Sequence, residues 1–203
     1  MSGAVRRRTF VAGLGVAGAG LALGACSGPA GLAASAYTGD FRTIALAAAL
    51  ENEAIGGYRA LIAALRAGRL GGQEPALVSL AETCLSQHTE HARTWNAILR
   101  SGHRPAISGV PLSGHASVLR AIGSAATVGQ AVALAIGLES RAEQTCVVAA
   151  GQLDSQAGLA AAASIAPVEA MHTASLRFLI GEYPTPSGFA GTADAASPRE
   201  LLA

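Results

Sequence analysis

The chain has 203 residues, enough for one domain with a substantial core. Its apolar content of 51% and aromatic content of 4%, with abundant alanine and leucine, favour helices over a β-sandwich or barrel. All 14 basic residues are arginine, which excludes enzymes that need a Schiff-base lysine, pyridoxal phosphate or a P-loop lysine. The net charge of +1 lacks the basic excess of a nucleic-acid-binding protein, so nucleic acid is not an expected partner.

Residues 1–25 have the features of an export signal, with three arginines followed by an uncharged apolar run. Arg7 and Arg8, followed by Phe10, resemble a bacterial twin-arginine signal. The residues Leu-Gly-Ala before Cys26 resemble a lipobox, whose cysteine carries lipid such as palmitate and becomes the new N-terminus. This pattern predicts a protein attached to the outer side of the cell membrane. The alternative is an ordinary secretion signal in which Cys26 is incidental.

Composition and helix-breaking residues divide the rest of the chain into three parts. Residues 26–39 predict a flexible tether, and residues 40–181 predict the folded domain. Residues 182–203 predict an irregular tail, in which Ser197 and Glu200 can form a capping box around one short turn.

Hydrophobic spacing within the domain predicts four long helices, with Asp40 and Thr127 as N-caps of the first and third. A long connection separates the second and third helices and contains a short helical piece at 116–122. Pro167 lies inside the fourth helix. The four predicted helices cover residues 40–68, 75–102, 127–151 and 155–181.

The inward-facing positions of these helices are apolar except near their middles, where six charged or titratable residues interrupt them. Burying unpaired carboxylates would cost several kcal/mol each, so a cation is the expected partner of this cluster. His88 and His91, and likewise Glu169 and His172, are three residues apart and therefore share a helix face. The six predicted metal ligands are Glu51, His88, His91, Glu139, Glu169 and His172.

Other polar residues are predicted to be solvated. Glu53, Glu82 and Glu90 fall outside the inward-facing positions, and His103 and His115 lie in the long connection.

The pattern over residues 40–181 resembles the ferritin-like superfamily, whose di-iron or di-manganese sites take one Glu from each of two helices and Glu-x-x-His from the other two. The resemblance implies an all-α, ferritin-like four-helix bundle with a long crossover between the second and third helices. It also implies that Tyr58 lies beside the ligand Glu51 on the first helix, where it can hydrogen-bond a ligand.

One ligand departs from the family pattern, because His88 stands where the family usually has Glu. Two divalent ions would then meet three carboxylates, unless Glu143 turns inward from one helical turn beyond Glu139. The departure leaves open a site for one metal ion, or for zinc in place of iron or manganese.

The resulting interpretation is an exported, lipid-anchored, ferritin-like protein that binds iron or manganese and can act as a metal-dependent oxidoreductase on dioxygen or peroxide. The alternative is a non-enzymatic envelope lipoprotein that uses the bundle as a structural or partner-binding module. A bundle that has lost its metal, and a homodimer, also stay open. The crossover would place Cys84 and Cys146 on opposite sides of the cluster, so we expect two free thiols.

Overall fold

The computed structural model of the protein describes residues 36–72 and 74–202. These residues form five α-helices and a short 3-10 helix near the C-terminus, with no strand beyond an isolated bridge between Leu112 and Leu201. The all-α prediction is confirmed, and each long helix begins and ends within two residues of its predicted bounds. The elements are α1 (Asp40–Arg66), α2 (Pro75–Ser101), α3 (His115–Ser124), α4 (Val128–Gln152), α5 (Gln156–Leu179) and η2 (Pro198–Glu200).

Arg7, Arg8 and Cys26 lie outside the described residues, so the export and lipidation hypotheses stay predictions. Within the part of the chain that the structure describes, no helix is both long enough and apolar enough to cross a membrane.

The starts of α4 and α5 are capped by side chains, whereas the start of α1 is not. The hydroxyl of Thr127 accepts the N–H of Gln130, and that of Ser155 accepts the N–H of Gly158. The prediction that Asp40 caps α1 is wrong, because Asp40 is already the first helical residue. Its carboxylate instead accepts the backbone N–H of Ser155 at 2.7 Å, which ties the start of α1 to the start of α5.

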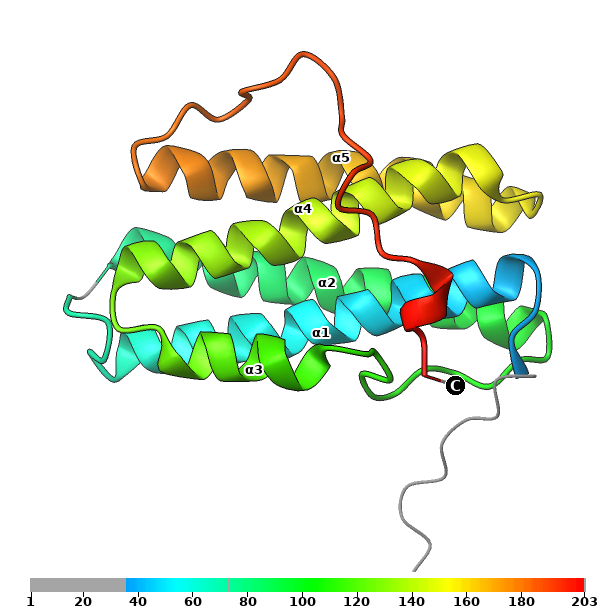
Figure 1. Ribbon diagram of the computed structural model, residues 1–203, viewed down its shortest axis with the longest axis horizontal. Helices are drawn as coiled ribbons and strands as arrows, with labels where there is room; N and C mark the ends of the chain where they lie inside the picture. Colours follow the sequence, from blue (N-terminus) through cyan, green and yellow to red (C-terminus); the bar gives the residue numbers. More distant parts are fainter. Residues whose placement is uncertain (1–35, 73, 203) are drawn as a thin grey trace, which may run out of the picture. The chain divides into compact units, whose positions relative to one another are not determined.

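The four long helices are arranged as two antiparallel pairs, α1 with α2 and α4 with α5 (Figure 1). The connection after α2 runs back along α1 and includes α3, the green helix beside α1 in Figure 1. As a result α2 and α4 run in the same direction, and so do α1 and α5. The predicted crossover between the second and third long helices is confirmed.

Two apolar clusters fill the bundle, and every long helix contributes to both. The first cluster contains Ile44, Trp95, Cys146 and Ile165; the second contains Leu61, Cys84, Val132 and Leu176. Along α1 and α5 the first cluster precedes the second, and along α2 and α4 the order is reversed, as the crossover requires. The polar residues in the middle of each helix therefore form one layer between the two clusters, which we call the polar layer.

The prediction that Glu53 is solvated is wrong, because the side chain is only 2% exposed. The short helix α3 and the C-terminal turn η2 pack against α1 and cover its outer face. His115 is also not free in solvent: it is the first residue of α3, and its Nδ1 lies 3.0 Å from Glu53 Oε1. Arg141 on α4 lies 3.5 Å from the second oxygen of Glu53. The expectation of solvation holds for the other three residues, Glu82, Glu90 and His103.

The C-terminal tail folds back across the bundle and ends beside the crossover (Figure 1). The N–H of Ala196 donates to the Thr145 hydroxyl at 2.9 Å, and the N–H of Ser113 donates to the carbonyl of Glu200 at 2.9 Å. The predicted capping box between Ser197 and Glu200 is confirmed and encloses η2.

Candidate metal centre

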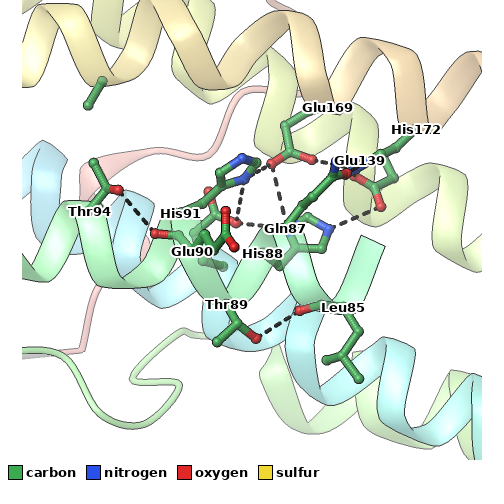
Figure 2. Close-up of polar contacts among 12 residues, drawn as sticks. Leu85, Gln87, His88, Thr89, Glu90, His91, Thr94, Glu139, Glu169 and His172 are labelled. Atoms are coloured by element: carbon green, nitrogen blue, oxygen red, sulfur yellow. Dashed lines mark hydrogen bonds and ion pairs between the residues drawn. The ribbon is translucent and has the colours of Figure 1, made fainter. Parts of the chain in front are cut away.

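The polar layer brings together all six residues that the sequence singled out. Each of the four long helices contributes, because one position per turn faces the bundle axis and these residues occupy such positions at the same depth. Five of them are labelled in Figure 2, where α2 supplies two imidazoles that face the carboxylates of α4 and α5. Five of the six are buried, and the side chain of His91 is 13% exposed. By helix, they are Glu51 on α1, His88 and His91 on α2, Glu139 on α4, and Glu169 and His172 on α5.

The six residues form two groups of four that share two members. In each group, one potential ligand atom from every residue lies within 4.8 Å of the others. Glu51 and His91 belong to the first group alone, and Glu139 and His172 to the second alone. The remaining two residues, His88 and Glu169, belong to both.

In the first group, the Nδ1 atoms of two histidines face the carboxylates of Glu51 and Glu169. His88 Nδ1 lies 2.8 Å from Glu51 Oε2, and His91 Nδ1 lies 2.8 Å from Glu169 Oε1. A third distance, 3.7 Å between His91 Nδ1 and Glu51 Oε2, links the two pairs. These nitrogen and oxygen atoms converge on one position between α1, α2 and α5.

In the second group, His172 is held between the carboxylates of α4 and α5. Its Nδ1 lies 3.2 Å from Glu139 Oε2 and 3.1 Å from Glu169 Oε2. His88 Nε2 lies 3.1 Å from Glu139 Oε1. The hydroxyl of Tyr58 donates to the same oxygen of Glu139, which places this tyrosine against the group, as the resemblance implied.

Gln87 contacts the second group, and the sequence analysis missed it. Its side-chain oxygen accepts a hydrogen bond from His172 Nε2 at 2.5 Å, so Nδ1 is the nitrogen of His172 that faces the carboxylates. Gln87 precedes His88 and is not at an inward-facing position, so periodicity carried no signal for it. Glu143, the additional carboxylate suggested by the sequence, belongs to neither group.

The carboxylates of Glu51 and Glu139 are stabilised in their charged form. Burial acts to raise both pKa values, but hydrogen bonds and charges of the neighbouring imidazoles outweigh it, so the pKa of each carboxyl is lowered. For Glu169 the balance is reversed: burial outweighs the hydrogen bonds from His172 and His91 and raises its pKa.

The three imidazoles are stabilised as imidazolium ions. Burial acts to lower each pKa, but the facing carboxylates raise that of His88 well above its ordinary value and that of His91 to about 9. Hydrogen bonding to Cys84, Glu139 and Glu169 raises the pKa of His172 to about 12. Three carboxylates therefore face three groups that bind protons tightly, and these protons would be displaced by any metal ion that binds here.

The composition of the cluster suits a transition-metal ion. Carboxylate oxygens and imidazole nitrogens are ligands of iron, manganese and zinc, and each group offers two of each kind. Burial removes these donors from competing contacts with water. The cluster is thus compatible with metal binding, and its donors do not favour one of these metals over the others.

Comparison with known proteins agrees with this architecture. No curated protein and no solved structure gives a significant match to the sequence. The family described as "Ferritin-like domain" matches residues 39–182, a span that begins just before α1 and ends just after α5. Because this match includes well over half of the chain and all six residues of the polar layer, the protein belongs to the ferritin-like domain family.

Proposed function

We propose that this protein is an exported, lipid-anchored metal-binding protein whose polar layer holds iron or manganese. The observation that carries the proposal is the convergence of six nitrogen and oxygen donors from four helices, in two overlapping groups, inside an apolar bundle. A metal ion supplies the positive charge that makes burial of three carboxylates favourable. No other cation in the described residues faces these carboxylates apart from the histidines themselves.

In this proposal each helix supplies ligands with distinct roles. Glu51 and Glu139 would act as terminal ligands, Glu169 would be shared between the two groups, and His91 and His172 would provide terminal nitrogens. Tyr58 donates to Glu139 and so orients that carboxylate. Bound iron or manganese would supply electrons to dioxygen or peroxide, which would make the protein a metal-dependent oxidoreductase.

Loading with metal tests the proposal directly. We expect the full chain, purified and incubated anaerobically with Fe(II) or Mn(II), to retain about one to two ions and to unfold at a higher temperature. Glu169→Ala combined with His172→Ala should abolish both effects. His103→Ala, which changes an exposed histidine outside the layer, should leave both unchanged. A wild-type protein with no bound metal and no thermal stabilisation would contradict the proposal.

The location is proposed from the N-terminal sequence. Cys26→Ser should leave the protein exported but release it from the membrane, because the acyl chains supply the anchor. Replacing Arg7 and Arg8 with lysine should retain the protein in the cytoplasm if export uses the twin-arginine route. Fractionation of cells with an antibody against the bundle would measure both effects, and normal export of the lysine variant would indicate the general secretory route.

A second function is favoured by one observation: the three Glu and three His side chains of the polar layer pair with one another without a metal. The bundle would then be a structural or partner-binding module of the cell envelope. The same loading experiment separates the two, since this module would gain no stability from added metal.

A further inference from the structure

Two residues of the polar layer occupy a special position, because they alone belong to both groups. Glu169 presents one oxygen to each side: Oε1 lies 2.8 Å from His91 Nδ1, and Oε2 lies 3.1 Å from His172 Nδ1. His88 does the same with its ring nitrogens: Nδ1 lies 2.8 Å from Glu51 Oε2, and Nε2 lies 3.1 Å from Glu139 Oε1. Figure 2 shows the ring of His88 beside the carboxylates of Glu139 and Glu169.

We propose that His88 bridges two metal ions, with Nδ1 bound to the ion in the first group and Nε2 bound to the ion in the second. The proposal rests on the metal-binding function proposed above. With His88 and Glu169 both shared, each ion has two carboxylate oxygens and two imidazole nitrogens as protein ligands.

The surroundings of His88 differ from those of the other histidines in the layer. A terminal histidine binds metal through one nitrogen and donates its other N–H to a carbonyl, a carboxylate outside the coordination sphere or water. The ring of His88 is fully buried, and both of its nitrogens face carboxylates that belong to the ligand groups themselves. His172 shows the usual arrangement in the same cluster, with Nε2 donating to Gln87.

The ring of His88 is also held in this orientation. Tyr58 stacks on it with ring centroids 5.4 Å apart and an angle of 29° between the planes. A flip of the ring about the Cβ–Cγ bond would replace each nitrogen with a ring carbon, so the hydrogen bonds to Glu51 and Glu139 oppose it. The two nitrogens therefore stay directed at the two groups.

The charge balance agrees with a bridge. Two divalent ions bring four positive charges, and Glu51, Glu139 and Glu169 supply three negative charges. An imidazole that binds an ion at each nitrogen releases its last ring proton to bulk solvent and carries the fourth negative charge. Glu143, which lies in neither group, is then not needed as a fourth carboxylate.

The decisive measurement is nuclear magnetic resonance of the full chain labelled with ¹⁵N-histidine and loaded with ¹¹³Cd(II), a diamagnetic ion that nitrogen ligands couple to. We expect both ring nitrogens of His88 to couple to ¹¹³Cd, each to a different ion, with no ring N–H. His91 and His172 are internal controls and should each show one coupled and one protonated nitrogen. A His88 ring with one coupled nitrogen and one N–H would overturn the proposal while leaving the metal-binding function intact.

Zinc stoichiometry of variants provides an independent test. Wild-type protein should hold about two Zn(II) ions per chain, and His88→Gln, which has a single strong ligand atom, should hold about one. His88→Glu should again hold about two, because a carboxylate offers two oxygens. Two ions retained by His88→Gln, or a single ion in the wild type, would overturn the bridge. A wild type that binds no zinc and no cadmium would overturn both the bridge and the proposed function.

Discussion

Cys84 and Cys146 are both buried and unpaired, and they lie in different apolar clusters on opposite sides of the polar layer. This separation follows from the crossover, because α2 and α4 run in the same direction and the two cysteines occupy opposite ends of their helices relative to the layer. An up-down-up-down bundle would have placed both in one cluster.

The separation predicts that Cys84 and Cys146 do not form a disulfide, even under oxidising conditions, because a disulfide requires Cα atoms within about 7 Å. Alkylation after denaturation of oxidised protein, followed by peptide mass spectrometry, should find both thiols modified. A peptide pair linked through Cys84 and Cys146 would contradict the topology described above.

Removing the hydroxyl of Tyr58 is expected to destabilise the protein and change its metal site. Tyr58 donates to the buried, charged carboxylate of Glu139, and such hydrogen bonds contribute about 1.5–3 kcal/mol. Tyr58→Phe should therefore lower the free energy of unfolding by that amount and weaken metal retention. Tyr37→Phe is a matched control: its hydroxyl donates to the Pro105 carbonyl, so it should cost about 0.5–1.5 kcal/mol and leave metal retention unchanged. Equal metal retention in both variants would show that Tyr58 does not orient Glu139.

Glu53 is expected to matter for stability although it lies outside the polar layer. Its buried carboxylate joins His115 on α3 and Arg141 on α4. Glu53→Ala therefore removes the acceptor of His115 and one of the two carboxylates that face Arg141, the other being Glu200. We expect a loss of about 1–3 kcal/mol in urea unfolding. Glu90→Ala, on an exposed position of α2, should change stability by no more than about 0.5 kcal/mol. Similar effects of the two substitutions would argue against burial of Glu53 beneath α3.

Substituting alanine for each of two adjacent glycines in α1 should have different effects on the stability of the protein. A Cβ at Gly56 would meet no atom within 4 Å, so Gly56→Ala should stabilise the helix by up to about 1 kcal/mol. A Cβ at Gly57 would lie 2.7 Å from Leu138 Cδ1 and 3.3 Å from Ile122 Cδ1, where α3 and α4 approach α1. We expect Gly57→Ala to be less stable than Gly56→Ala by about 1–3 kcal/mol in thermal unfolding, because the crowded side chains must shift. Equal stabilities would show that α3 and α4 do not pack closely at this point.

The metal-free protein should lose stability as the pH rises. The ordinary pKa of a histidine is 6.5. In the fold, burial acts to lower the pKa of His91, but hydrogen bonds and charges of Glu169 and Glu51 outweigh burial and raise it to about 9. Between these two pH values the folded state holds a proton that the unfolded state releases. The stabilisation that protonated His91 gives to the fold is therefore complete below about pH 6.5 and is lost as the pH rises to about 9. Urea unfolding in a chelator at about pH 6 and about pH 9 would measure the decline. His91→Gln should reduce the decline, and His103→Gln, at an exposed position, should not.

Much of the fold could be predicted from the sequence, because a helix depends on interactions between residues three and four positions apart. The apolar spacing indicated four helices, the cap at Thr127 marked the start of one of them, and the structure confirms these features. The charged and titratable residues at inward-facing positions likewise selected the six residues that meet in the polar layer.

Other features depended on contacts between segments far apart in the chain. Glu53 was expected in solvent because periodicity identifies only the face of α1 that meets the other long helices, and it carries no information on the packing of α3 over the opposite face. The partner of Asp40 lies at residue 155, and Gln87 reaches His172 across the bundle. The spacing of His88 indicated only that it faces the layer. That each ring nitrogen faces a different ligand group was decided by the relative depth and rotation of four helices, which only the packing of their side chains determines.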